Sequence, residues 1–421
     1  MSDGAALTVA DHDLLLDLLD TPTVNPLEGG PARMADAQLR YARAAEQAGL
    51  EVVHHGAPAA ADVAGDPLPE PVRRAMADPG YLAGQPSTVL RLGPPLPREA
   101  TVMFNVHLDT VAGVPPAAFD GRRFVGRGAI DAKGPAVALL AGVRAARAAL
   151  PALGREVGVL VQAVAGEEGG ALGTIGTRPL VAAGWTGRLN VFAEPTGLRA
   201  LDRSTAAATA RIRVDGEDSI DDRPEAGHNA TVLLGFLAQH LARTLIAPGV
   251  CIAGLHTGDL HNRVYGRGEL LLNLAYPDRA TGVRRVAETE RAVAAGLVDF
   301  AAAFTAVPAL ARTARDATRI CRVEWPKRDL PALPGPADPW TEPLLADAGI
   351  AAWPAAEPAF TCDAIWMAGV PGTATVVLGP GDLAANRAHA DGEFAALAEL
   401  DAYADAVARL LAAFTRSGAS A

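Results

Sequence analysis

The alternation of strand-like and helix-like segments between residues 87 and 194 restricts the fold of this 421-residue chain more than any other feature. Short apolar runs such as STVLRLG and ATVMFNV are typical of buried strands. The long helical segment KGPAVALLAGVRAARAAL follows, and EVGVLVQAVAG and RLNVFAE then predict two further strands around a short helix, GTRPLVAAGW. Strands that alternate with helices favour an α/β unit with a mixed, mostly parallel sheet and flanking helices.

The order of elements changes after about residue 200. A strand (TAAATARIRVDG) and a helix (NATVLLGFLAQHLARTLI) come first, followed by one or two strands within HNRVYGRGELLLNLAYP. A second helix, RRVAETERAVAAGLVDFAAAF, and a final strand, ATRICRVEW, complete a β-α-β-β-α-β series. This series predicts a small ferredoxin-like α+β sandwich.

The α/β character returns after the linker-like run DLPALPGPADP, with TATVVLGPG and a long C-terminal helix. The simplest architecture is a catalytic domain built from residues 1–200 and 326–421, into which residues 201–325 are inserted as a second domain. Residues 56–86 are rich in Ala, Pro and Gly and are interpreted as a surface insertion.

Composition excludes several classes of function. The formal charge is −11 and the basic residues form no cluster, which disfavours nucleic-acid and anionic-membrane partners. Cys251, Cys321 and Cys362 are far apart and have no CxxC spacing, so we expect neither a disulfide framework nor a thiolate zinc site. The N-terminal residues show no signal-peptide pattern and no apolar run approaches ~18 residues, which predicts a cytoplasmic protein.

Polar side chains follow three of the predicted strands. His107 and Asp109 follow TVMFNV and, two residues apart, point to the same face if the strand continues. Glu167 and Glu168 end the next strand, and Glu194 ends RLNVFAE. Adjacent carboxylates at a strand end face opposite ways, so one can bind a cation while the other faces a substrate. Each pattern taken alone is also compatible with a solvated strand end.

Two loops add further candidates. Asp131 lies in the glycine-rich run FVGRGAIDAKGPA, where it can also be a simple helix cap, and Walker spacing is missing. His389 lies in NRAHADGE, shortly after a predicted strand, and a single histidine is often a surface or packing residue. In an open parallel sheet, however, such strand ends gather in one crevice at the carboxyl edge.

The five candidate ligands contain no thiolate, and histidine with carboxylate suits Zn²⁺, Mn²⁺ or Co²⁺. Three carboxylates and two histidines are too many for one catalytic ion. They fit two ions that share one bridging carboxylate, ~3.5–4 Å apart. The predicted ligands are His107, Asp131, Glu168, Glu194 and His389.

Five motifs in this order, HLDTV, GRGAIDAKG, GEEGG, AEPTG and GPGDLAANRAHADGE, make the chain similar to a known family. It resembles the co-catalytic zinc aminoacylases and exopeptidases, which include acetylornithine deacetylase, succinyl-diaminopimelate desuccinylase and the glutamate-releasing carboxypeptidases. The resemblance covers nearly the whole chain. It implies a two-domain subunit, a lid domain through which the protein forms a homodimer, and two zinc ions, with cobalt or manganese as alternatives.

The resemblance also implies the role of each ligand. His107, Asp131 and Glu194 hold one ion, while Asp131, Glu168 and His389 hold the other, which makes Asp131 the bridge. Their numbers are those of this sequence.

Glu167 is implied as the general base and acid, which moves a proton from water to the leaving amine. Asp109 is expected to accept the second N–H of His107 and so to set its tautomer. Glu393, four residues after His389, is expected to support that ligand from a following helical turn.

The inserted domain contributes two matches and one departure. His228 in RPEAGHNATV matches a lid histidine that donates to the oxyanion, and Asn262 in GDLHNRVYG matches a substrate-contacting asparagine. The family's D-x-R motif is missing, because Asn273 and Ala275 stand at the equivalent positions in LLLNLAYP. Its arginine clamps a substrate carboxylate.

Either Arg263 or Arg267 therefore replaces the missing clamp, or the substrate has no free α-carboxylate. The leading hypothesis is a dinuclear zinc amidohydrolase, of aminoacylase or deacetylase type, that cleaves an N-acyl amino acid or a dipeptide-like amide. A second hypothesis is a metal-binding homologue with lost or redirected catalysis, motivated by the altered lid strand. A two-metal phosphatase is the third, and it lacks a visible basic clamp.

Overall fold

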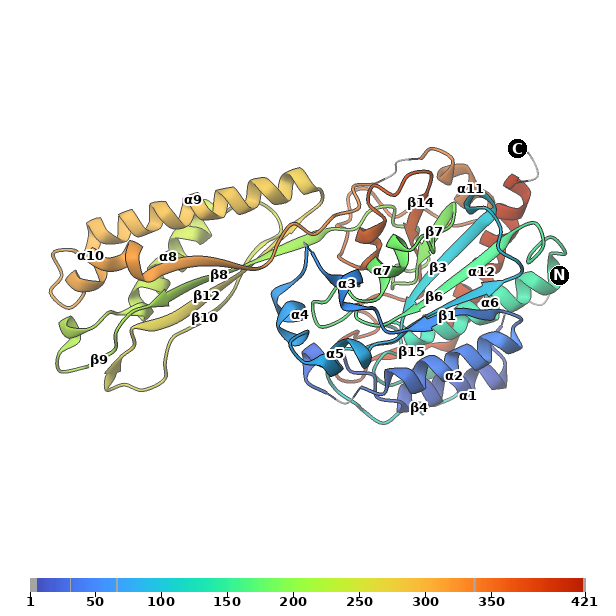
Figure 1. Ribbon diagram of the computed structural model, residues 1–421, viewed down its shortest axis with the longest axis horizontal. Helices are drawn as coiled ribbons and strands as arrows, with labels where there is room; N and C mark the ends of the chain where they lie inside the picture. Colours follow the sequence, from blue (N-terminus) through green and yellow to red (C-terminus); the bar gives the residue numbers. More distant parts are fainter. Residues whose placement is uncertain (1–5, 31, 66, 336–337, 419–421) are drawn as a thin grey trace. The chain divides into compact units, whose positions relative to one another are not determined.

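The computed structural model describes residues 6–30, 32–65, 67–335 and 338–418. The chain divides into two compact units, Met1–Ser204 with Leu333–Ala421, and Thr205–Ala332. The first unit contains both ends of the chain, and the second is coloured yellow-green to orange in Figure 1. The boundaries between the units lie a few residues beyond those expected at 200 and 325.

The first unit is organised around a six-stranded sheet. Its central strands run parallel, since β3 pairs in parallel with β6 and β7, and β7 pairs in parallel with β14. At one side of the sheet, β2 pairs antiparallel with both β1 and β6, which confirms a mixed, mostly parallel sheet. The spatial order is β1 (Glu51–Gly56), β2 (Ser87–Leu92), β6 (Gly158–Val164), β3 (Thr101–His107), β7 (Leu189–Phe192) and β14 (Ala374–Val377).

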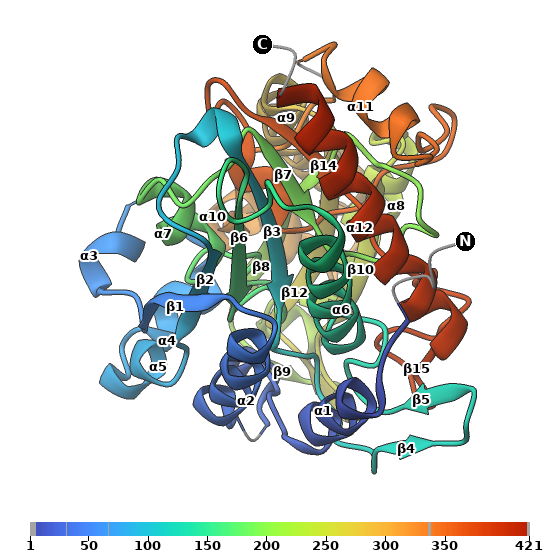
Figure 2. The same cartoon turned by 90° about the vertical axis from the view of Figure 1, so that its right-hand side faces the viewer.

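Both faces of the central strands are buried, which explains why they read as continuous apolar runs. On β3, Phe104 and Val106 join the larger core, while Met103 points to the opposite face and joins a smaller one. Besides the short α11 (Thr341–Asp347), four long helices contribute side chains to the larger core, and two of them, α6 and α12, pack against each other (Figure 2). The four long helices are α1 (Val9–Asp20), α2 (Met34–Gln47), α6 (Lys133–Ala149) and α12 (Leu397–Gly418).

The smaller core lies beneath two short elements, α7 (Thr177–Ala182) and the 3-10 helix η4 (Asp363–Met367). Leu180 of α7 and Met367 of η4 pack there. A separate three-stranded antiparallel sheet includes the strand that leads into α12. Its strands are β4 (Ala118–Phe119), β5 (Arg123–Val125) and β15 (Phe394–Ala396), and the remaining elements are η1 (Pro26–Glu28) and η2 (Arg98–Ala100).

Residues 56–86 are more ordered than the expected surface insertion. They form three short helices, α3 (Ala60–Val63), α4 (Glu70–Ala75) and α5 (Pro79–Ala83), and prolines occupy the first turns of α4 and α5. Proline suits a first turn because its missing N–H would have no partner in the helix there. Val63, Val72 and Tyr81 form a small core with Ala171 and Ile175, so the segment packs on the chain that follows β6.

The second unit is a four-stranded antiparallel sheet in the order β10-β12-β8-β13. With its helices it follows the expected β-α-β-β-α-β series of a ferredoxin-like sandwich. Leu270, Leu272 and Leu274 of β12 alternate with less buried residues, as on a sheet with one covered face. The elements are β8 (Ala206–Asp215), β9 (Ser219–Ile220), η3 (Pro224–Ala226), α8 (Ala230–Thr244), β10 (Val250–His256), β11 (Arg263–Val264), β12 (Arg267–Tyr276), α9 (Arg279–Phe304), α10 (Ala311–Ile320) and β13 (Cys321–Lys327).

The start of the last strand was expected too early. Residues ATRI belong to α10, and β13 begins only at Cys321. The buried side chains Thr313, Ala317 and Ile320 are three or four residues apart, which is the spacing of a helix and not of a strand. Strands β1 and β10 were not expected at all.

The three cysteines are free, and only Cys362 is buried. Among the helices that the structure describes, none combines the length and apolar character needed to cross a bilayer.

Candidate metal centre

The five predicted ligands come together at one edge of the central sheet. His107 is the last residue of β3, and Glu168 and Glu194 follow β6 and β7. Since these strands are parallel, their carboxyl ends lie side by side. Asp131 precedes α6, and His389 lies in the connection between β14 and β15.

Asp131 is the centre of the cluster. Its Oδ1 lies 2.9 Å from His107 Nε2, and its Oδ2 lies 3.0 Å from His389 Nε2. His389 Nε2 is also 3.0 Å from Glu168 Oε1, and His107 Nε2 is 3.8 Å from Glu194 Oε1. The two oxygens of one carboxylate thus face two different imidazoles, each of which faces a further carboxylate.

The carboxylates are buried and close together, which is costly for anions. Burial raises the pKa of Glu168 to about 7, and the Asp131 charge adds to this rise. Burial also raises the pKa of Glu167, with the Glu168 charge as the next cause. The pKa of Glu194 rises for the same two kinds of reason, burial and then the Asp131 charge.

The imidazoles respond in the opposite sense. Hydrogen bonds to Asp131 and Glu168 raise the pKa of His389 to about 10. Although burial opposes ionisation of Asp131, its bonds to His107 and His389 lower its pKa. The Nε2 atoms of both histidines thus lie within hydrogen-bond distance of the Asp131 carboxylate. Among the residues that the structure describes, His107, Asp131 and Glu168 offer ligand atoms that all lie within 4.8 Å of one another.

The donor set fits a divalent metal. It consists of carboxylate oxygens and imidazole nitrogens without a thiolate, the chemistry that suits Zn²⁺, Mn²⁺ or Co²⁺. The His389 side chain is half exposed, whereas the other four are buried, so the cluster is open on the His389 side. His389 itself has a φ of 63°, a left-handed conformation that is strained for residues with a Cβ and is concentrated at functional sites.

Asp109 does not orient His107 in the way expected. The Nδ1 atom of His107 lies 2.9 Å from the main-chain oxygen of Asp109 and 3.8 Å from its carboxylate. The carboxylate instead accepts hydrogen bonds from the main-chain N–H groups of Glu167 and Glu168, at 3.2 and 3.0 Å, and from Asn25 Nδ2 at 2.9 Å. Buried N–H groups need an acceptor, and Asp109 supplies it where the strand ladder ends.

Glu393 also differs from expectation, because it does not contact His389 from a helical turn. Its carboxylate accepts bonds from the loop that carries Asp131, and Arg127 pairs with it at 2.8 Å. The chain from 386 to 393 is irregular, which brings Glu393 to the start of β15 and beneath that loop. The main-chain donors, at 3.0 to 3.4 Å, are Gly128, Ile130 and Asp131.

The candidate residues of the second unit have partners inside that unit. His228 is buried, its Nδ1 accepts the Glu217 N–H at 2.9 Å, and its Nε2 lies 3.1 Å from Asp316 Oδ2. With Nδ1 as an acceptor, the ring proton is on Nε2 and is donated to Asp316. The predicted oxyanion role of His228 stays a prediction. It requires His228 to donate the Nε2 proton to the oxyanion and no longer to Asp316.

Arg263 is exposed and forms an ion pair with Asp218, with the Tyr265 ring beside its guanidinium. Asn262 is exposed in the turn before it. Arg267, the other possible clamp, lies 3.4 Å from Asp215. Their predicted substrate contacts stay predictions.

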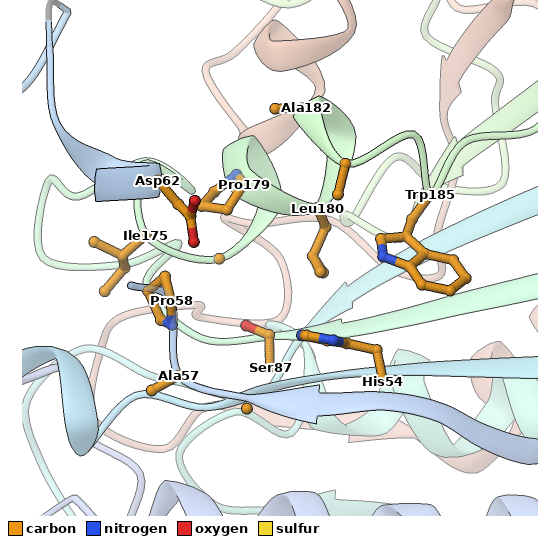
Figure 3. Close-up of a pocket in the computed structure, with 13 residues that line it drawn as sticks. His54, Ala57, Pro58, Asp62, Ser87, Ile175, Pro179, Leu180, Ala182 and Trp185 are labelled. Atoms are coloured by element: carbon orange, nitrogen blue, oxygen red, sulfur yellow. The ribbon is translucent and has the colours of Figure 1, made fainter. Parts of the chain in front are cut away.

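A cavity of about 360 Å³ lies apart from these residues, between α7 and the segment that carries α3. None of the predicted site residues lines it. Figure 3 shows Trp185 and His54 toward one end of this cavity and Asp62 toward the other. Its size is compatible with a ligand, but it contains none of the clustered carboxylates that distinguish the sheet edge.

Two functional candidates escaped the sequence patterns. Asn25 lies in the run TPTVNP that follows α1, and its amide donates to Asp109 and to the Glu168 carbonyl. Asp363 is buried beside the loop that follows Glu168. It does not end a predicted strand, so the only signal for it in the sequence is that it is a single acid in an otherwise apolar run.

The fold and this donor set define a metal-dependent hydrolase of the peptidase class. A family model described as peptidase family M20/M25/M40 matches residues 103–413, and the chain belongs to this family. Over 171 residues the chain is 32% identical to a protein of Aeropyrum pernix named as a LysW-lysine/LysW-ornithine hydrolase. That match covers 40% of this chain and 46% of the relative, so it spans less than half of the relative's length.

Solved structures share the fold over nearly the whole chain. The aminopeptidase PepT from Bacillus cereus has a TM-score of 0.67 at 16% identity, over 98% of this chain and 100% of its own. A metallo-carboxypeptidase of the M20 family from Sulfolobus solfataricus, Sso-CP2, has a TM-score of 0.66 at 12% identity, over 97% and 99%. At these identities the likeness is one of fold. Together with the family match it identifies the chain as a hydrolase of the metallopeptidase type.

Proposed function

We propose that this enzyme is a dinuclear amidohydrolase that cleaves an N-acyl amino acid or a dipeptide-like amide. The supporting observation is the position of Asp131, whose two oxygens face His107 and His389 at 2.9 and 3.0 Å. One ion would be held by His107, Asp131 and Glu194, and the other by Asp131, Glu168 and His389. Zinc is the proposed metal, with cobalt or manganese as alternatives.

Such ions lower the pKa of water and polarise a scissile carbonyl. The chain then has to move one proton, from the attacking water to the leaving amine, and Glu167 is the proposed carrier. Burial raises the pKa of Glu167, which suits a carboxylate that has to accept a proton and then release it. The Asp109 carboxylate holds the main-chain N–H of Glu167 at 3.2 Å and so orients the peptide from which this side chain projects.

The names of the relatives support an amide bond as the target. One is a LysW-lysine/LysW-ornithine hydrolase, and the two described structures are an aminopeptidase and a metallo-carboxypeptidase. The acyl group and the amine are not assigned. Homodimerisation through residues 205–332, a role for His228 at the oxyanion and a cytoplasmic location belong to the same proposal.

The test is hydrolysis by the metal-loaded protein of a panel of N-acetyl, N-succinyl and dipeptide substrates, repeated with Glu167→Gln. Loss of a general base predicts a fall in kcat of about 10²–10⁴-fold, with unchanged metal content. Undiminished turnover by the variant contradicts the proposed role of Glu167. Two bound ions without hydrolysis of any amide would instead favour a ligand-binding homologue, the alternative suggested by Asn273 and Ala275 on β12.

A further inference from the structure

The loop of residues 166–177, called the Glu167 loop below, closes on its own beginning. Leu172 donates its main-chain N–H to the Glu167 carbonyl at 2.8 Å, and Gly173 donates to the Gly166 carbonyl at 2.7 Å. The position of the Glu167 peptide therefore depends on where Leu172 and Gly173 lie. Asp109 holds the N–H side of that peptide, but it has no bond to this far part of the loop.

The 3-10 helix η4 holds the far part of the Glu167 loop. Trp366 donates its indole N–H to the Leu172 carbonyl at 2.6 Å, and Asp363 Oδ2 accepts the hydroxyl of Thr177. The Asp363 carboxylate also lies directly against Gly173, where an added Cβ would be only 2.3 Å from Oδ1. Gly173 has a φ of 64°, so both its backbone and this close approach require glycine.

A buried series of side-chain hydrogen bonds connects η4 to β3, the strand that ends at the predicted ligand His107. Asn105 Nδ2 donates to Thr177 Oγ1 at 3.0 Å and to Gln162 Oε1 at 2.9 Å. Gln162 donates in turn to the Trp185 carbonyl at 2.7 Å. Asn105 is on β3, two residues before His107, and points to the same face of the sheet. Asp363 is thus connected, through the side chains of Thr177 and Asn105, to the strand that ends at His107.

Asp363 keeps one oxygen without a hydrogen-bond partner in the described part of the chain, although only 1% of the residue is exposed. Leaving a buried acceptor unpaired costs stability. An apolar residue would pack against Gly173 without that cost, so packing alone does not account for an acid at this position. The bond to Thr177 and the contact with the Glu167 loop are what the carboxylate provides.

We propose that Asp363 and Trp366 are positioning residues. They hold the Glu167 loop in a fixed position relative to the sheet edge that carries the predicted metal ligands. The inference rests on the proposed function, because it gives these residues the task of placing the general base. They act through Leu172, Gly173 and Thr177 and touch neither substrate nor metal.

Two mild substitutions remove the two connections. Trp366→Phe removes the donor to Leu172 but keeps an aromatic ring at this position. In the wild type the Trp366 ring lies 5.4 Å from the Arg178 guanidinium. Thr177→Val removes the donor to Asp363 at nearly constant volume, and Thr177→Ser restores it. The loop also packs through Ala171 and Ile175 on α3 to α5, so the variants are expected to fold.

Matched control variants change the same residue types elsewhere in the first unit. Trp353→Phe removes an indole N–H that lies 3.4 Å from the Glu357 carbonyl. Thr415→Val removes a hydroxyl that bonds within α12. Neither side chain contacts the Glu167 loop through any bond that the structure describes.

Each test variant is expected to lower kcat by about 10- to 100-fold, because small displacements of a catalytic group have effects of this size. KM and metal content should stay close to those of the wild type, since substrate and metal ligands are untouched. Hydrogen–deuterium exchange should become faster in peptides that cover residues 166–177 and stay unchanged in residues 381–392. Thr177→Ser should restore both readouts, and the control variants should change neither.

Unchanged kcat together with unchanged exchange of the Glu167 loop would overturn the inference. A fall in kcat that is matched by Trp353→Phe and Thr415→Val would also overturn it, because the effect would then be a general loss of stability. If the wild-type protein hydrolyses no amide, the proposed function fails. The exchange experiment still decides whether η4 holds the loop.

Discussion

The two units of the molecule differ in whether their charged side chains are buried or exposed. In the first, Asp131, Glu168 and Glu194 are buried within a few ångströms of two histidines, and burial works against the charge of each carboxylate. In the second, a typical pair such as Arg322–Asp215, at 3.1 Å, has both side chains more than a third exposed. The buried ring of His228 has an acceptor in its own unit, Asp316.

This difference shows where the chain depends on a ligand. Exposed pairs contribute little and need nothing more, whereas buried like charges remain costly until a cation joins them. The charged pairs of the second unit therefore need no ligand, whereas the sheet edge of the first unit is where a bound cation would stabilise the fold. Each of the following predictions tests one side of that comparison.

The largest effect is expected at the shared carboxylate. Asp131→Asn leaves the size of the residue unchanged but removes the charge that faces both histidines. Metal affinity should fall by more than about 100-fold, because even partners that only orient metal ligands are worth 10- to 100-fold. Isothermal titration calorimetry with Zn²⁺ measures this change. Asp120→Asn, in an exposed turn, is the control, and equal affinity in the two variants would break the comparison.

A truncation in the core of the second unit should lower stability and leave metal binding unchanged. Leu270 of β12 is fully buried, and Leu270→Ala should lower the free energy of unfolding by about 2–5 kcal/mol. Metal content per folded chain should not change, since no predicted ligand lies in this unit. Chemical denaturation and elemental analysis measure the two quantities. Leu255→Ala, at an exposed position of β10, should change neither.

The smallest effect concerns an ordinary ion pair of the first unit. Burial tends to raise the pKa of Asp11, but two hydrogen bonds from Arg144 and those from Thr8 outweigh it, so the pKa lies below its ordinary value of 3.8. A lowered folded-state pKa stabilises the fold above the unfolded-state pKa, and this stability is lost as the pH falls through the folded value. Asp11→Asn should therefore lower Tm near pH 7.

The Tm difference between Asp11→Asn and wild type should shrink as the pH falls below about 4, where Asp11 begins to be protonated in the unfolded chain. Scanning calorimetry at several pH values follows it. Asp17→Asn is the control, because Asp17 forms a more exposed pair with Arg40. A difference that stays constant with pH would show that the ion pair is not the cause.

Much of the architecture follows from patterns of a few residues. The apolar runs that became β3, β6 and β7 are buried on both faces, so their sequence signal is strong, and the acids and histidine at their ends indicated the site. Strand β1 was not predicted, because EVVHHG is mostly exposed and lacks an apolar face. Residues 311–320 carry a helical period, with arginines on one face and Thr, Ala and Ile on the buried face, but their last four residues were assigned to the strand that follows.

Contacts between distant residues were harder to predict. Asn25 and Asp109 are 84 residues apart, and Asp363 and Thr177 are 186 apart, and no local period connects either pair. The choice between the Asp109 carboxylate and its main-chain oxygen as the partner of His107 depends on how the chain turns after β3. Such choices are made by tertiary packing, which a run of residue types does not encode.

Anomalous X-ray diffraction from crystals grown with excess metal, collected across the zinc, cobalt and manganese absorption edges, tests the metal centre most directly. Two peaks are predicted on either side of Asp131, about 3.5–4 Å apart, as in sites where two ions share a carboxylate. One peak should lie beside His107 and Glu194, and the other beside Glu168 and His389. A single peak, or none at this sheet edge, would contradict a dinuclear site.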